Sequence, residues 1–247
     1  MTQTDPDAFT LGENLATTPG KIIFQNDLIQ LIQYSPTTEK VYKTPLLITP
    51  PFINKYYILD LDKQKSLVRW LVAQGHSVFV ISWVNPEADK SEVDFANYME
   101  QGTIAAIKTV KKVTKSRKVN MVGWCVGGTL LSITVAYLAA QKDHSVNSMT
   151  LLTTLLDFSQ PGELGHYLSD DMLPWIEKQV DQKGILDGRV LSLAFSMLRE
   201  NNLFWSFFIN NYLKGKDPAP FDILYWNSDP TNLPAAFFKQ YIHETYR

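Results

Sequence analysis

A single cysteine stands inside a run of glycines, an arrangement that suits a nucleophile attacking carbonyl groups. The run is Gly123-Trp124-Cys125-Val126-Gly127-Gly128. It follows a short apolar stretch at 119–122 and precedes an apolar stretch at 129–140, so it joins a predicted strand to a predicted helix. This is the nucleophile-elbow pattern, with Cys where Ser is usual.

The elbow predicts how Cys125 would react. Glycines two residues before and two after it would let the turn close, and the helix N-terminus would favour the thiolate and lower the pKa of the thiol. The Val126 amide would stabilise the oxyanion of the tetrahedral intermediate. A second donor is expected from the loop after the strand at 45–49, where the Ile53 amide is the candidate.

Two other roles for Cys125 are considered. Most lone cysteines are buried core residues. Here the strand, the glycines and the helix all agree on an elbow, so the nucleophile is favoured over a core role. Since the sequence has one cysteine, it can form neither an intrachain disulfide nor a metal site of several cysteines. No metal or cofactor is predicted.

A general base is harder to find. A thiol nucleophile normally needs a His oriented by an acid, and in this fold both follow the nucleophile along the chain. His76 precedes Cys125, His144 lies in a predicted surface loop, and His166 and His243 lie in the C-terminal part. Asp157, after a predicted strand at 149–156, is a minor candidate for the acid, although a strand-end or helix-capping role is favoured.

The rest of the chain predicts how the elbow is held. Apolar runs at 21–25 and 28–34 flank Asn26-Asp27 and indicate a hairpin, and continuous apolar runs at 45–50 and 77–83 indicate buried parallel strands. Helical patterns at 63–74 and 93–113 alternate with them. The sequence therefore predicts a doubly wound, mostly parallel α/β sheet of the α/β-hydrolase type, apparently lacking its last strands.

The alternation of strands and helices ends at Asp157. We expect residues 1–157 to form an incomplete hydrolase core and residues 158–247 to form an inserted cap domain. The cap would be mostly helical and irregular, with helical patches at 191–197 and 204–212.

Composition and charge narrow the class of protein. The 247 residues carry 23 Lys and Arg against 25 Asp and Glu, a net charge of −2, so no basic excess favours nucleic acid as a partner. The N-terminus has no secretory signal pattern, and no apolar stretch reaches the length of a transmembrane helix. A cytoplasmic protein is the simplest expectation.

Three stretches resemble a known family. They are Pro50-Pro51-Phe52-Ile53-Asn54-Lys55-Tyr56-Tyr57-Ile58-Leu59-Asp60-Leu61, the elbow with Thr129, and Asn211-Tyr212-Leu213-Lys214-Gly215 through Phe221-Asp222-Ile223-Leu224-Tyr225-Trp226-Asn227-Ser228-Asp229-Pro230-Thr231-Asn232-Leu233-Pro234. Together they are similar to the class I polyhydroxyalkanoate synthases, which polymerise 3-hydroxyacyl-coenzyme A (CoA) into polyester.

The resemblance implies that Cys125 takes the acyl group from the thioester of a short substrate such as 3-hydroxybutyryl-CoA, and that CoA is released. It also implies homodimers formed through the cap and association with polyester granules in the cytoplasm. The family's catalytic His and Asp follow the cap, and no position here matches them. We therefore expect the chain to be shortened at both ends.

Two alternatives remain open from the sequence. One is a cysteine-dependent esterase or thioesterase, in which water accepts the acyl group. The other is a catalytically silent paralogue that acts as a partner subunit because its base is missing. The segment containing Leu224-Tyr225-Trp226-Asn227 favours the polymerase, because a hydrolase has no need of it.

Overall fold

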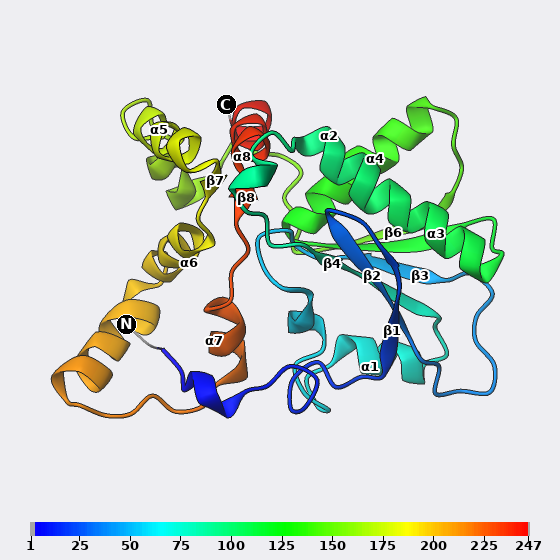
Figure 1. The fold of residues 1–247 in the computed structure, drawn as a ribbon, viewed down its shortest axis with the longest axis horizontal. Helices are drawn as coiled ribbons and strands as arrows, with labels where there is room; N and C mark the ends of the chain where they lie inside the picture. The colour runs from blue at the N-terminus through cyan, green and yellow to red at the C-terminus, as the bar shows by residue number, and fades with distance from the viewer. Residues whose placement is uncertain (1–2, 247) are drawn as a thin grey trace.

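A six-stranded sheet forms the centre of the molecule (Figure 1). The computed structural model describes residues 3–246, except for the side chains of Glu163, Leu164 and Tyr167. The strand order is β1-β2-β4-β3-β5-β6; β1 and β2 are antiparallel to each other, β2 is antiparallel to β4, and the remaining pairs are parallel. The strands are β1 (Gly20–Gln25), β2 (Ile29–Tyr34), β3 (Leu46–Thr49), β4 (Val78–Trp83), β5 (Val119–Trp124) and β6 (Val146–Leu152). The predicted hairpin and parallel sheet are confirmed.

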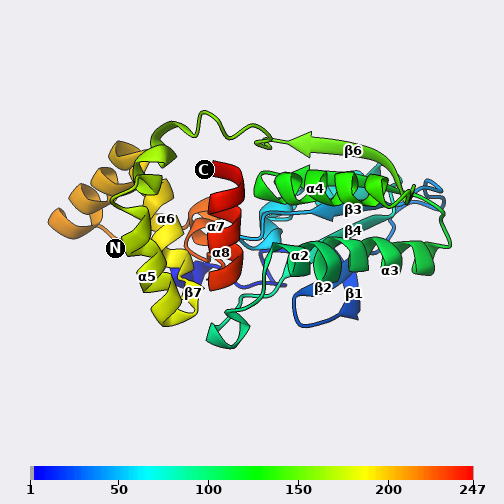
Figure 2. The same ribbon diagram turned by 90° about the horizontal axis from the view of Figure 1, so that it is seen from above.

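Helices cover both faces of this sheet, as Figures 1 and 2 show. Neighbouring residues of one strand point to opposite faces. Ile48 and Val80 pack in the cluster that contains residues of α1 (Leu67–Ala73). Leu47 and Phe79 pack in the cluster that contains residues of α3 (Ala105–Thr114) and α4 (Val126–Ala140). The unbroken apolar runs of the sequence are thus explained by burial on two faces.

Two helices differ from their predicted bounds. The helix predicted at 63–74 begins at Leu67, because the Ser66 side chain accepts a hydrogen bond from the Arg69 N–H and caps the helix. The helix predicted at 93–113 is divided into α2 (Phe95–Asn97), a π-helical stretch (Tyr98–Ile104) and α3. Within the π-helical stretch Gly102 lies against the indole of Trp83, where a Cβ would stand 2.6 Å from a ring carbon.

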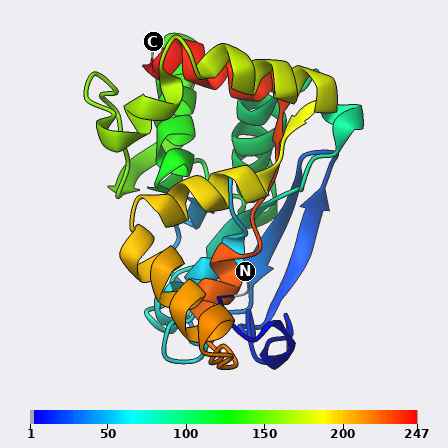
Figure 3. The same ribbon diagram turned by 90° about the vertical axis from the view of Figure 1, so that its left-hand side faces the viewer.

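The residues after β6, here called the C-terminal segment (residues 158–246), lie beyond the carboxyl ends of the parallel strands (Figures 2 and 3). The helical patches predicted at 191–197 and 204–212 are confirmed. The segment also has a small antiparallel sheet that the sequence did not indicate. Its elements are Gly162–Leu168 (3₁₀), α5 (Leu173–Lys183), β7 (Ile185–Leu186), α6 (Gly188–Met197), the π-helical stretches Asn201–Trp205 and Phe208–Leu213, α7 (Asp222–Asn227), β8 (Leu233–Pro234), α8 (Ala235–Tyr241) and a π-helical end, Ile242–Tyr246.

Aromatic packing joins the C-terminal segment to the sheet. Phe52, which follows β3, is fully buried. Its ring lies 4.8 Å from that of Phe237 and 5.9 Å from that of Tyr241, both on α8. Residues of α8 accordingly belong to the same core cluster as those of the strands, so the division into core and cap at Asp157 stays a prediction. Within residues 3–246, no helix is both long enough and apolar enough to cross a bilayer.

Candidate active site at the strand-to-helix elbow

Cys125 occupies a strained turn between β5 and α4. Its backbone has φ 50° and ψ −130°, which places a residue with a Cβ in a region that favours glycine. Such a conformation costs on the order of 1–3 kcal/mol and persists only where the surroundings hold it. The Cys125 N–H donates to the Leu152 carbonyl oxygen at 2.9 Å, and its own carbonyl accepts from the Gly128 N–H at 2.9 Å.

The glycines of the elbow are required by close packing. A Cβ on Gly123 would stand 2.5 Å from the Cα of Gly128. A Cβ on Gly127 would stand 2.4 Å from the Pro50 carbonyl oxygen and 2.5 Å from that of Thr49. These neighbours are backbone atoms that cannot rotate away, so the absence of side chains brings the start of α4 against the loop that follows β3.

The electrostatics of Cys125 correct one sequence-based prediction. The thiol is free and half-buried. Burial raises the pKa of the Cys125 thiol above its ordinary value, and the Val126 N–H, which donates to the sulfur, opposes this rise without reversing it. The predicted lowering of the pKa is therefore wrong for this structure, because loss of water around the sulfur outweighs the backbone donor at the helix N-terminus.

This pKa predicts how alkylation of Cys125 should depend on pH. Only the thiolate reacts, so a raised pKa leaves a small thiolate fraction at neutral pH. We expect the iodoacetamide rate to rise about tenfold per pH unit between about pH 7 and 9. Mass spectrometry of the modified cysteine measures it, with Cys125→Ser as the blank. A rate that levels off below about pH 8 would show a lowered pKa instead.

An apolar cavity of about 160 Å³ lies beside the elbow. Both candidate oxyanion residues, Val126 and Ile53, line it, so the structure brings these two predicted site residues together. The other lining residues come from the C-terminal segment: Leu168, Ile176, Leu186, Val190, Leu191, Ala194, Phe195, Leu233, Phe238, Tyr241, Ile242 and Tyr246. The cavity therefore offers an apolar space beside Val126, the residue that follows Cys125.

Two tyrosines that the sequence analysis missed lie near Cys125. Burial raises the pKa of Tyr241 and of Tyr246, and the nearby Cys125 raises each further. The two phenols are close enough to alter each other's pKa. The buried Tyr241 oxygen nevertheless has no partner of acceptable hydrogen-bond geometry among the described residues. Nothing in their local sequence marks them, since only the folding of α8 over the elbow brings them there.

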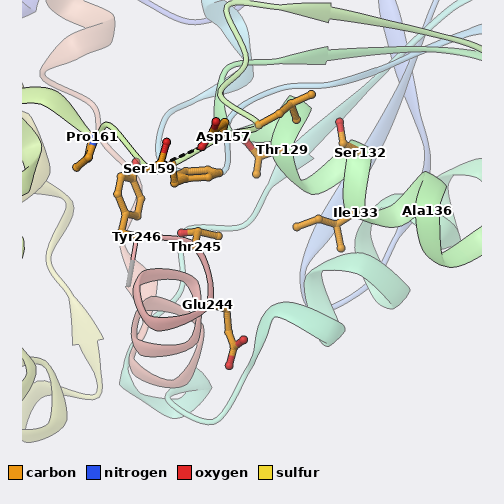
Figure 4. Close-up of a pocket in the computed structure, with 12 residues that line it drawn as sticks. Thr129, Ser132, Ile133, Ala136, Asp157, Ser159, Pro161, Glu244, Thr245 and Tyr246 are labelled. Carbon is orange, nitrogen blue, oxygen red and sulfur yellow. Dashed lines mark hydrogen bonds between the residues drawn. The ribbon is translucent and has the colours of Figure 1, made fainter.

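The predicted acid lies in a different setting from the one expected. β6 ends at Leu152, so Asp157 is in an exposed loop and not at a strand end. Its carboxylate accepts from the Ser159 N–H at 2.9 Å, which is the dashed contact in Figure 4 and which lowers the pKa of Asp157. Asp157 lines an open hollow of about 750 Å³ between α4 and the chain end.

The histidines have other surroundings. The charge of Cys125 acts on the pKa of Tyr241 and of Tyr246. Among the described residues, no histidine acts on the pKa of Cys125. The Nε2 of His243 lies 2.6 Å from the Glu177 carboxylate, and His76 packs on Tyr42 with ring centroids 4.9 Å apart. His144 and His166 are exposed.

Comparison with known proteins agrees with this geometry. The model for the alpha/beta hydrolase fold matches residues 60–246, which include strands β4 to β6, the elbow and the C-terminal segment. The chain belongs to the α/β-hydrolase fold family. The predicted fold class is thus confirmed. A second model, the N-terminus of poly-beta-hydroxybutyrate polymerase (PhaC), matches residues 1–71.

Curated relatives of this hydrolase-fold chain extend over its whole length. It is 50% identical over 244 residues to the poly(3-hydroxyalkanoate) polymerase of Methylorubrum extorquens, covering 99% of this chain and 40% of the relative. It is 44% identical over 251 residues to the poly(3-hydroxyalkanoate) polymerase subunit PhaC of Cupriavidus necator, covering 100% of this chain and 43% of the relative. The chain therefore spans about two fifths of the length of these relatives.

Solved structures give a weaker likeness. Carboxyl esterase 2 of the fungus Tuber melanosporum aligns with 66% of this chain and 53% of its own, at 13% identity and a TM-score of 0.45. The assignment of the fold rests on the family model and on the sheet topology.

Proposed function

We propose that Cys125 carries the acyl group in a polymerisation of 3-hydroxyacyl-CoA, with 3-hydroxybutyryl-CoA as the substrate to test first. One observation carries the proposal: the cysteine stands at a strained elbow beside an apolar cavity, in a chain whose curated relatives are poly(3-hydroxyalkanoate) polymerases. A buried core cysteine would have no need of a positive φ, which costs free energy.

In the first step the Cys125 sulfur attacks the thioester carbonyl carbon, and the carbonyl π electrons move to oxygen. The backbone amides of Val126 and Ile53, two residues that line the same cavity, would donate to that oxyanion. The intermediate then expels the CoA thiolate, which takes up a proton, and leaves a hydroxyacyl thioester on Cys125. In the second step the hydroxyl of another hydroxyacyl unit attacks this thioester, loses its proton to a base and displaces Cys125.

The raised pKa of Cys125 makes a base necessary in the first step. A thiol that is mostly protonated at neutral pH must transfer its proton before or during attack. The described histidines do not act on the pKa of Cys125, so the His and Asp that the resemblance implies stay a prediction. Tyr241 is not a substitute, because burial raises its pKa and keeps it protonated.

The predicted homodimer, the granule surface and the cytoplasmic location belong to the same proposal. Large apolar side chains exposed on the C-terminal segment support an association surface there, namely Val190, Leu193, Trp205, Ile209, Tyr212 and Leu213. Single exposed apolar residues are common on soluble proteins, but several together indicate a contact with a partner or an apolar phase.

The identity of the product separates a polymerase from a thioesterase. We expect the full-length protein to convert 3-hydroxybutyryl-CoA into insoluble polyester, with one CoA released per residue added and little free 3-hydroxybutyrate. Chromatography of the soluble products, alongside methanolysis of the pellet, measures both. Free 3-hydroxybutyrate in amounts equal to the CoA released would contradict the proposal and establish water as the acceptor.

A further inference from the structure

The loop that carries Ile53 is held by residues about 170 positions further along the chain. We call residues 226–232, from the end of α7 to the residue before β8, the link segment. The Thr231 N–H donates to the Ile53 carbonyl oxygen at 2.9 Å, and Asn54 and Pro230 form an antiparallel bridge. The Thr231 N–H thereby restrains the peptide unit of the Ile53 carbonyl from outside its own loop, and the Ile53 N–H belongs to the peptide unit directly before it.

Side chains extend this contact along the loop. The Trp226 Nε1–H donates to the Lys55 carbonyl oxygen at 2.8 Å. The Tyr57 hydroxyl, on a fully buried ring, donates to the Asp229 carboxylate at 2.9 Å, and the Lys55 ammonium lies 3.9 Å from the same carboxylate. Residues 53, 55 and 57 each have a partner in the link segment.

The other end of the link segment holds the wall of the apolar cavity. The Asn232 side chain accepts from the Gly188 N–H at 2.9 Å, where α6 begins, and donates to the Pro86 carbonyl oxygen at 3.1 Å. Residues of α6, including Leu191 and Phe195, line the cavity. One short segment therefore fixes both the Ile53 loop and the helix that faces it.

We propose that the link segment positions the Ile53 amide for acyl transfer at Cys125, with Trp226 and Tyr57 as positioning residues. The inference rests on the proposed function, since an oxyanion donor matters only if Cys125 is acylated. An oxyanion donor stabilises the developing charge only when its N–H points at the oxyanion. A small displacement of the Ile53 amide therefore lowers the acylation rate and leaves the reactivity of the Cys125 thiol unchanged. The Thr231 bond to Ile53 and the Trp226 bond to Lys55 restrain the loop just after the Ile53 amide, and the Tyr57–Asp229 bond restrains it two residues further on.

Two reactions of the same sulfur separate positioning from general damage. Acylation by 3-hydroxybutyryl-CoA passes through an oxyanion, whereas alkylation by iodoacetamide displaces iodide and needs no oxyanion hole. In the full-length protein, we expect Trp226→Phe, which keeps an aromatic ring but is smaller than the indole and loses its N–H, to slow acylation of Cys125 about tenfold to a hundredfold. Its alkylation rate should stay within about twofold of the wild type.

The matched control is Trp175→Phe, on an exposed tryptophan of α5, which should leave both rates unchanged. Tyr57→Phe, which loses only the bond to Asp229, is the second variant and should give a smaller loss of the same kind. Equal acylation in Trp226→Phe and wild type, or equal losses of acylation and alkylation, would overturn the proposal.

Amide hydrogen exchange tests the same contact without any chemistry at Cys125. Residues 52–58 should exchange faster in Trp226→Phe than in wild type, while α4 should be unchanged. Unchanged exchange in that loop would overturn the proposal. Faster exchange together with no acylation of the wild type would instead show that the link segment holds the loop and that the proposed function has failed.

Discussion

Replacing Cys125 by Ala is expected to reduce CoA release from 3-hydroxybutyryl-CoA by at least about 10³-fold, since the sulfur that would carry the acyl intermediate is lost. Any residual rate would come from the oxyanion donors and the cavity acting on water as nucleophile. CoA release followed by a thiol reagent measures the effect, with the melting temperature of the variant as the check on folding.

Cys125→Ser is the matched control for this prediction. It restores a nucleophile of nearly the same shape, but its hydroxyl requires a stronger base than the thiol does. We expect Cys125→Ser to release CoA at least about 10²-fold more slowly than the wild type while folding as well as it does. A rate within about tenfold of wild type for Cys125→Ala would remove Cys125 from the mechanism.

Gly127→Ala is expected to lower the free energy of unfolding by about 2–4 kcal/mol, because the added methyl meets backbone atoms that cannot rotate away. The added methyl would meet the carbonyl oxygens of Pro50 and Thr49 at 2.4 and 2.5 Å, so α4 must move away from the loop after β3. That movement also separates the Val126 and Ile53 amides. CoA release should therefore fall even at temperatures where the variant is fully folded.

The comparison variant for Gly127 is Gly165→Ala. There the nearest atom to an added Cβ is a Pro161 side-chain carbon at 3.3 Å, which allows a small adjustment. Denaturant unfolding of both variants gives the two free energies, and Gly165→Ala should lie within about 1 kcal/mol of wild type. Equal stability of Gly127→Ala and wild type would mean that the elbow is packed more loosely than the structure shows.

The elbow was predictable because its signal is local. A strand, a glycine-flanked cysteine and a helix follow one another within about twenty residues, and each has its own sequence pattern. The placement of Ile53 near Val126 was also predictable from the sequence. Adjacent parallel strands end at the same edge of a sheet, and β3 and β5 are adjacent. These predictions needed only the order of the strands.

The surroundings of Cys125 were not predictable in the same way. Tyr241 and Tyr246 reach the site only because α8 packs through Phe237 onto Phe52, a contact between residues far apart in the chain. The thiol pKa was predicted in the wrong direction because burial of the sulfur depends on this same packing. The bounds of β6 were misplaced because Leu155 and Leu156 continue its apolar pattern, although both are exposed after the strand ends.

The central claim is that Cys125 forms a hydroxyacyl thioester, and mass spectrometry of the full-length protein tests it most directly. After brief incubation with 3-hydroxybutyryl-CoA and acid quenching, the peptide containing Cys125 should carry a hydroxybutyryl group, or a short chain of them, that hydroxylamine removes. The adduct should be absent from Cys125→Ala. CoA release from the wild type with no adduct on Cys125, or with the adduct on another residue, would contradict the account.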